Sequence, residues 1–113
     1  MARSFGQRKL WMFVKGFIGR TGRCRVLAYR GATKALLNSY TSRRLRKRDM
    51  RRLWITRISA GCKEYGLNYS NFIKGLADDH IALNRKTLSE LALSEPYSYR
   101  ALVERVKQMR GLA

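Results

Sequence analysis

The sequence predicts an all-α protein in which a long basic N-terminal helical arm precedes a small C-terminal helical bundle. A proline-free segment from about residue 23 to 65 repeats its residue types every three or four positions, which is the spacing of a helix face. Three shorter segments, about 70–77, 84–93 and 98–110, each place apolar residues on one side of a helix. No stretch shows the strict alternation of apolar and polar residues that is typical of a half-buried strand.

The first expected element is a short helix within residues 1–19. Basic residues are mixed there with apolar ones, and Gly16 and Gly19 weaken the end of the helix. The aromatic residues are spread around the helix, which argues against an amphipathic helix lying on a membrane surface. Residues 19–23 should then form a turn, and the small residues among them would let another backbone approach closely.

Charge separates two parts of the chain. The 113 residues carry a formal net charge of +18, far more than solubility requires, which indicates an anionic partner. Residues 1–52 contain 16 Lys/Arg and one acid, Asp49, whereas residues 53–113 contain nine Lys/Arg and six acids. Seven cations fall within residues 43–52, and on a helix they cover roughly two-thirds of the circumference. We therefore expect a basic arm over 1–52 and a small helical domain over 53–113, with the long helix spanning their boundary.

One row of neighbours along the long helix is mostly apolar at first, cationic for three steps, and then apolar again. The cationic part cannot pack on protein, because burying unpaired charges is prohibitive. The later apolar part should pack in the C-terminal core, and Trp54 is expected there. The earlier apolar part should pack either on the N-terminal helix or on RNA bases. The row comprises Val26, Tyr29, Thr33, Leu36, Tyr40, Arg44, Lys47, Arg51, Trp54, Ile58, Cys62 and Tyr65.

Local signals set the ends of the C-terminal helices. Gly66 follows the long helix and suits the left-handed residue that closes a helix. Ser70 and Asn84 suit the capping position that precedes a helix. Pro96 marks a boundary before the last helix, which ends at Gly111.

The residues needed for catalysis or metal binding are missing. Asp78, Asp79 and His80 are adjacent on an expected polar connection, without a nucleophile or a second His to work with. Cys24 and Cys62 would lie roughly 57 Å apart on a continuous helix, beyond disulfide reach, and no Cys/His spacing suits zinc. We therefore expect no enzyme, no cofactor and no metal. No apolar run approaches the ~20 residues of a membrane span.

The cations and some aromatic residues are candidates for nucleic-acid contact. Arginine is always charged, and its planar fork suits phosphate oxygens. Such contacts give affinity and a strong dependence on salt. Tyr29, Tyr40 and Trp54 can stack on unpaired bases or pack in protein, and for Trp54 we expect the core. Lys74, Arg85 and Lys86 lie near presumed helix ends, where they can reach phosphates or serve as ordinary surface charge.

Several other kinds of protein share the composition of the basic arm. A run such as residues 43–52 also occurs in soluble basic helices and in nuclear-localisation signals. The first 48 residues contain no acid, as in an organelle transit peptide, but the bias continues past any plausible cleavage point. A nucleic-acid chaperone, a DNA-compacting protein and a membrane-active basic protein would be equally rich in Lys and Arg.

Five sequence blocks are more specific than composition, and they cover residues 15–19, 42–60, 68–76, 83–88 and 101–104. The most specific part, Lys-Arg-Asp-Met-Arg-Arg-Leu-Trp-Ile, covers residues 47–55. In this order, and over nearly the whole chain, the blocks resemble the bacterial-type large-subunit ribosomal protein "L-twenty" family.

The resemblance implies a structural constituent of the large ribosomal subunit and not an enzyme. The arm would thread through large-subunit ribosomal RNA, the C-terminal domain would also bind that RNA, and the protein would support early subunit assembly. The expected partners are this RNA and neighbouring large-subunit proteins, with no membrane and no homo-oligomer. By position in the family, the RNA-contacting residues of the arm would be Lys15, Arg20, Arg23, Arg25, Arg30, Arg43, Arg44, Arg46, Lys47, Arg48, Arg51 and Arg52.

One stretch departs from the bacterial pattern. Residues 88–99 resemble mitochondrial members of the family more than bacterial or plastid members. The expected location is therefore the large subunit of a mitochondrial ribosome, with the bacterial cytoplasm or a plastid as the alternative.

Overall fold

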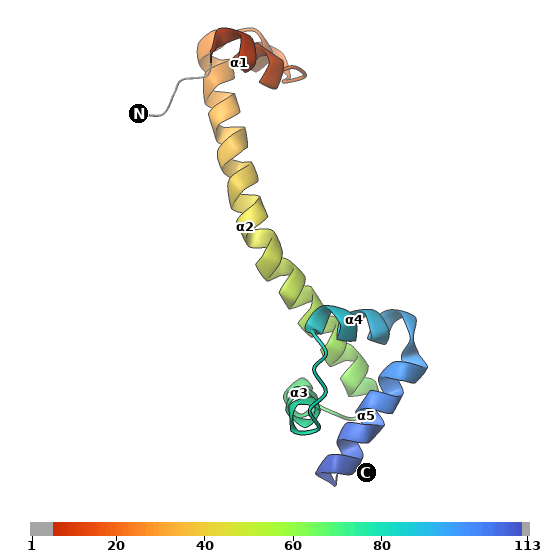
Figure 1. Cartoon of the computed structure of the whole chain (residues 1–113). Coiled ribbons are helices and arrows are strands. Elements are labelled where there is room, and N and C mark those ends of the chain that lie inside the picture. The colour runs from red at the N-terminus through yellow and green to blue at the C-terminus, as the bar shows by residue number, and fades with distance from the viewer. Residues whose placement is uncertain (1–5, 112–113) are drawn as a thin grey trace. The chain divides into compact units, whose positions relative to one another are not determined.

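Regular structure is entirely helical in residues 6–111, the range that the computed structural model describes (Figure 1). In chain order the elements are α1 (Gln7–Phe13), a short 3-10 helix η1 (Gly19–Gly22), α2 (Arg25–Glu64), α3 (Tyr69–Asp78), α4 (Arg85–Ser94) and α5 (Pro96–Arg110). The predicted all-α fold is confirmed. The helix expected within residues 1–19 begins at Gln7, and residues 1–5 and 112–113 lie outside the described range.

The ends of α2 lie close to the predicted residues 23 and 65. At the start, the backbone N–H groups of Leu27 and Val26 point at the Cys24 thiol and hold its pKa below the ordinary value. At the end, Gly66 takes the left-handed conformation, with φ of 70°. The N–H of Leu67 then donates to the Cys62 carbonyl at 2.9 Å, which closes the last turn.

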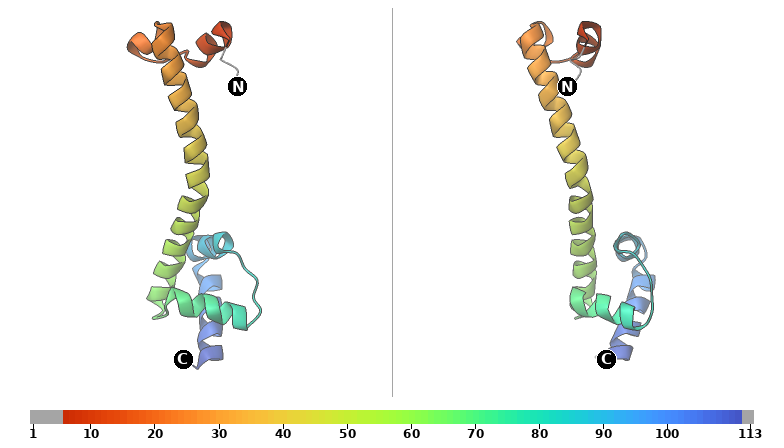
Figure 2. Two further views of the ribbon diagram at one scale, coloured as in Figure 1. Left: turned by 90° about the vertical axis from the view of Figure 1, so that its left-hand side faces the viewer. Right: turned by 60° about the vertical axis from the view of Figure 1, so that its left-hand side comes forward.

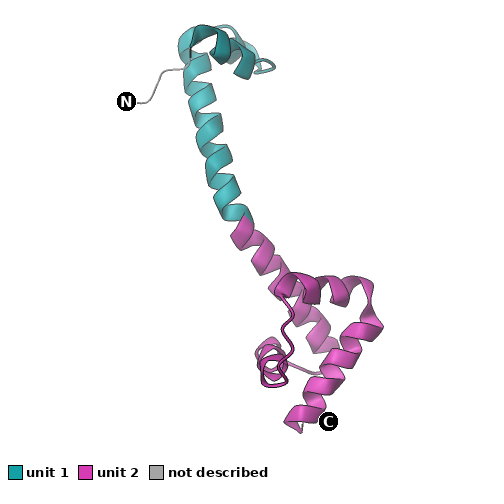
Figure 3. Ribbon diagram, viewed as in Figure 1, with its two compact units in different colours: residues 1–46 teal, residues 47–113 magenta. Residues whose placement is uncertain are grey.

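Two compact units divide the chain, residues 1–46 and residues 47–113, and α2 contributes residues to both (Figure 3). In the first unit, α1 and the residues after it pack on the N-terminal turns of α2. The buried residues of this small core are Leu10, Val14, Ala28 and Ala32, with Trp11 and Phe17 half-buried beside them. The first unit therefore rests on few large apolar side chains.

The early apolar part of the row on α2 does not pack on the N-terminal helix, so the first of the two expected alternatives is wrong, and packing on RNA bases stays a prediction. The helix α1 packs instead on the side of α2 that carries Ala28 and Ala32. A small residue also lets η1 approach α2 closely, since a Cβ on Gly31 would lie 2.8 Å from Thr21 Cγ2. Tyrosine and leucine side chains would hold the two segments further apart. The members of the row that stay exposed are Val26, Tyr29, Thr33, Leu36 and Tyr40.

The second unit packs α3, α4 and α5 with the C-terminal turns of α2 around one core. Figure 2 shows α3 lying across α5, and α5 contacts both α3 and α4. The late part of the row packs there as predicted, with Ile58 and Cys62 buried and Tyr65 half-buried. Trp54 is half-buried and lies outside this core, so its expected place is wrong. The buried core consists of Ile58, Cys62, Leu67, Phe72, Leu76, Leu88, Tyr99, Val103 and Val106.

The polar centre of this core is the hydroxyl of Tyr99. Its O–H donates to the Ile58 carbonyl at 3.0 Å, and its oxygen lies 3.0 Å from the Cys62 sulfur. Burial raises the pKa of both Tyr99 and Cys62. Both groups are therefore neutral at ordinary pH, which avoids burying a charge.

Of the three predicted starts of the C-terminal helices, one is confirmed and two lie at other residues. The side chain of Asn84 caps α4 by accepting the backbone N–H three residues later at 2.8 Å. The residue that precedes α3 is Asn68 rather than Ser70, and its side chain makes no capping bond. The helix α5 begins at Pro96 instead of about residue 98, because the fixed φ of proline suits the first helical position. Gly111, with φ of 63°, ends α5 as predicted.

The polar connection expected at residues 78–80 includes the end of α3 and a residue that forms an ion pair with α5. Asp78 is the last residue of α3. The Asp79 carboxylate accepts two hydrogen bonds from Arg105 of α5, at 2.9 and 3.2 Å. The same guanidinium holds the pKa of Asp79 below its ordinary value. This ion pair ties the end of α3 to α5.

Candidate nucleic-acid interface

Every residue of α2 from 36 to 53 is exposed. This stretch contains all seven cations of residues 43–52. Lysine and arginine are seldom buried without a partner, so turns that carry seven of them are not expected in a protein core. The surface of these turns is therefore free to meet a partner.

The first unit contains eight of the cations that were predicted to contact RNA. One follows α1, one lies in η1 and one directly after it, and the rest lie on α2. All eight side chains are exposed, and they are Lys15, Arg20, Arg23, Arg25, Arg30, Arg43, Arg44 and Arg46.

Two of these arginines are steadied by neighbours one helical turn earlier. The Arg43 guanidinium donates to the Ser39 hydroxyl at 2.6 Å. The Arg44 Nε donates to the Tyr40 hydroxyl at 3.2 Å, and its guanidinium carbon lies 5.5 Å from the centre of the same ring. Both contacts leave other N–H groups of the guanidinium available for an external acceptor.

In the second unit, the remaining predicted residues lie on α2, α3 and α4. Lys47, Arg48, Arg51 and Arg52 are exposed on α2. Lys74 on α3 and Lys86 on α4 are also exposed. Arg85, the first residue of α4, is half-buried, and its Nε donates to the Tyr69 hydroxyl at 3.4 Å. The long distance makes this a weak bond.

Acidic residues do not neutralise these surfaces. Within residues 6–111 the two ion pairs are Arg100 with Glu104 and Arg105 with Asp79. Neither pair includes a cation that was predicted to contact RNA, and among the described residues Asp49 pairs with none of its cationic neighbours. The positive charge on α2 is therefore uncompensated, which favours a polyanion as its partner.

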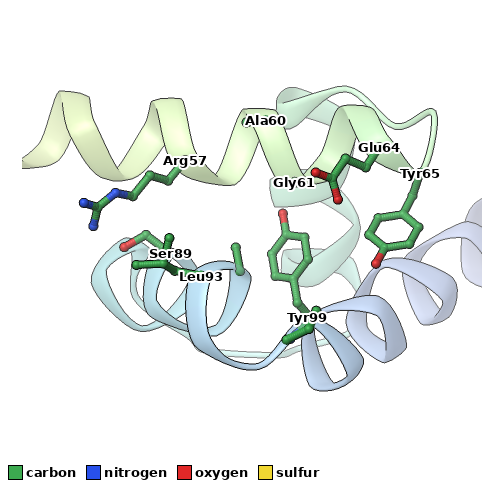
Figure 4. Close-up of a pocket in the computed structure, with 10 residues that line it drawn as sticks. Arg57, Ala60, Gly61, Glu64, Tyr65, Ser89, Leu93 and Tyr99 are labelled. Atoms are coloured by element: carbon green, nitrogen blue, oxygen red, sulfur yellow. The ribbon is translucent and has the colours of Figure 1, made fainter.

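The structure adds Arg57, a half-buried residue that sequence reasoning missed. It lines a pocket of about 190 Å³ in the second unit, formed by α2, α4 and the first residues of α5 (Figure 4). Figure 4 shows Tyr99 pointing from α5 toward Gly61 of α2 in this pocket. No described residue forms an ion pair with Arg57. No sequence pattern signals the pocket, because tertiary packing brings its walls together.

The described residues form no metal or redox centre. In the range 6–111, no group of three His, Cys, Asp or Glu side chains is placed to hold a metal ion. Cys24 and Cys62 are both free thiols. None of the described helices is long and apolar enough to cross a membrane.

Fold and surface together define a small, strongly basic, all-helical protein that displays uncompensated positive charge on exposed helix turns. The chain belongs to the ribosomal protein L20 family, since residues 1–102 match the sequence model of the family described as "Ribosomal protein L20". The resemblance seen in the sequence blocks is confirmed.

Similar proteins come from several bacteria, and each is named "Large ribosomal subunit protein bL20". The protein of Elusimicrobium minutum is 44% identical over 108 residues, which cover 96% of this chain and 92% of the relative. That of Rhodospirillum centenum is 45% identical over 101 residues, covering 89% and 85%. That of Magnetococcus marinus is 45% identical over 100 residues, covering 88% and 86%. The family consists of ribosomal proteins and not of enzymes, as expected.

Proposed function

We propose that the chain is a structural constituent of the large ribosomal subunit that binds large-subunit ribosomal RNA and supports assembly. The names of its relatives support the subunit. The observation that carries RNA binding is the exposed, unpaired cationic surface of α2 in residues 36–53. Ribosomal RNA is the polyanion that a protein of this family would meet first.

The proposed mechanism is neutralisation of phosphate. RNA segments repel one another, and cations placed between them let the segments pack more closely. The arm, residues 1–52, would supply this charge through the predicted cations described above. The domain over residues 53–113 would fix the position of the protein, with Lys74, Arg85 and Lys86 as further phosphate contacts. Neighbouring large-subunit proteins would complete its surroundings.

The location of the ribosome is a separate part of the proposal. Residues 88–99 are the one feature that favours a mitochondrial ribosome. The three relatives named above are bacterial and favour the bacterial alternative instead. Fractionation of the cells of origin, followed by sedimentation of the endogenous protein with ribosomal subunits, distinguishes these locations.

The test of RNA binding is the triple variant Arg44→Glu, Lys47→Glu and Arg51→Glu in the full-length chain. All three side chains are exposed, so the helices should stay folded by circular dichroism. If all three contact phosphates, their loss should reduce the slope of log K against log salt by roughly two to three. Large subunits should fail to incorporate the variant.

A control reverses three cations outside the proposed set, with Lys63→Glu, Arg100→Glu and Lys107→Glu. It changes the net charge equally but should be incorporated. Since Arg100 loses its ion pair with Glu104 in this control, circular dichroism checks that its helices are kept. Normal incorporation of the first variant would overturn the proposal. Equal binding of the wild-type chain to generic duplexes and to large-subunit RNA, in competition at moderate salt, would favour a general nucleic-acid chaperone instead.

A further inference from the structure

An apolar surface on α2 in the first unit is left uncovered by the described residues of that unit. We call it the tyrosine face; it consists of Val26, Tyr29, Thr33, Leu36, Leu37 and Tyr40. Val26 is 60% exposed, Tyr29 45%, Leu37 56% and Tyr40 50%. The small core of the first unit uses Ala28 and Ala32, which lie on another side of the helix. Clustered large apolar residues of this kind mark a site of interaction.

The tyrosine face is hollowed, and cations border the hollow. A depression of about 250 Å³ is lined by Tyr29, Arg30, Thr33, Lys34 and Leu37. The Thr33 hydroxyl is turned back to the Tyr29 carbonyl, to which it donates at 2.9 Å. The floor is therefore apolar, whereas Arg30 and Lys34 offer positive charge beside it.

A second aromatic side chain lies further along the same face. The ring of Tyr40 has the Arg44 guanidinium over it, 5.5 Å from ring centre to guanidinium carbon. The guanidinium plane is itself a group on which a base can stack, and it adds a phosphate ligand.

We infer that the tyrosine face binds unpaired RNA bases, which stack on Tyr29 and Tyr40. The phosphates of the same nucleotides contact Arg30, Lys34 and Arg44. The inference rests on the proposed function and names the form of RNA that this surface takes.

The charge around the tyrosine face favours a nucleotide over a protein as its partner. No acid occurs before Asp49, so every ionised side chain around the face is cationic. A nucleotide joins a flat apolar ring to a negative charge, which matches an aromatic floor with cationic edges. Because Thr33 donates its hydroxyl hydrogen to the Tyr29 carbonyl, it offers no donor to a base edge, and the hollow favours stacking over the reading of a particular base.

The experiment compares the full-length chain with the double variant Tyr29→Leu and Tyr40→Leu. Affinity is measured for a single-stranded RNA and for an RNA duplex of equal length, over a series of salt concentrations. Each stacked ring should contribute roughly 5- to 150-fold, so the double variant should bind a single strand at least about 25-fold more weakly. The salt slope should not change, because no phosphate ligand is removed, and duplex binding should stay the same.

Two controls separate stacking from other roles of the rings. The pair Tyr29→Phe and Tyr40→Phe keeps both rings and should bind single strands like the wild type. Tyr97→Leu removes a ring that is 87% exposed in the second unit, and it should have no effect. Circular dichroism checks that every variant keeps its helices.

The outcomes are separable from those of the charge-reversal test. Unchanged single-strand affinity of the leucine pair overturns base stacking, even where the chain still enters subunits through its cations. Ultraviolet crosslinking in assembled subunits gives an independent reading. Attachment of Tyr29 or Tyr40 to a nucleotide supports the inference, whereas attachment to a neighbouring protein overturns it.

Discussion

The hydroxyl of Tyr99 should stabilise the second unit, and its removal can be measured alone. The change Tyr99→Phe keeps the ring that packs beside Phe72, where the ring centres lie 5.5 Å apart. It deletes the bond to the Ile58 carbonyl and the contact with the Cys62 sulfur, both at 3.0 Å. With Tyr99 only 2% exposed, no water replaces the lost donor.

The expected loss is about 1 kcal/mol of the free energy of unfolding, the usual net value of one buried neutral hydrogen bond. Deleting the ring as well, with Tyr99→Ala, should cost roughly 3–5 kcal/mol, because a cavity is added. In a unit of this size a loss of about 1 kcal/mol lowers the midpoint of thermal unfolding by roughly 4–8 °C. The hydroxyl and the ring are thus distinguishable.

Denaturant unfolding followed by far-ultraviolet circular dichroism provides the measurement, with Tyr97→Phe as the exposed control. The difference between wild type and Tyr99→Phe should also depend on pH. Burial raises the pKa of Tyr99 above the ordinary value of 10.0 in the folded chain. Its contribution is therefore complete below about pH 10 and is lost as the pH rises further. A variant as stable as the wild type at neutral pH, or a difference that grows in alkali, would refute the reasoning.

Two further predictions concern single contacts at helix ends. Asn84→Ala should lower the stability by about 0.5–2 kcal/mol, because the cap of α4 is lost. Asn68→Ala, where the side chain makes no capping bond, should change it much less; equal losses in denaturant titrations would contradict the assignment. Asp79→Asn should remove part of the acid sensitivity of unfolding. Arg105 lowers the pKa of Asp79, so the ion pair stabilises the fold above the unfolded-state pKa and fails as the pH falls through the folded-state value. Thermal scans down to acid pH, in wild type and variant, measure this difference, and identical pH profiles would exclude the contribution.

Helix ends were the most predictable part of the fold, because their causes are local. Gly66 and Gly111 adopt the left-handed conformation that closes a helix. Asn84 accepts the N–H of its own first turn. Pro96 was recognised as a boundary, but a proline is equally suited to precede a helix or to begin one, and the tertiary fold chose the second.

Burial along α2 was harder to predict, because periodicity does not say which face another segment will choose. Tyr29 and Tyr40 share a face and are the more hydrophobic choice, yet α1 packs where Ala28 and Ala32 allow a close approach. Trp54 follows the same periodic row as Ile58 but lies one turn before the walls of the second core. Such differences depend on segments distant in sequence.

The exposed turns of α2 also explain why charge and helix formation should be linked in this chain. Residues 36–53 do not pack in either core of the described residues, so these turns lack the tertiary packing that usually supplies most of the stability of a helix. Like charges one turn apart, such as Arg44 with Arg48 and Lys47 with Arg51, each oppose the helix by about 0.2–0.5 kcal/mol. A bound polyanion offsets these repulsions, because each cation gains an attraction to a phosphate at the same position. The proposed RNA partner therefore stabilises the helix that displays its own binding residues, and the exposure of those turns follows from that role.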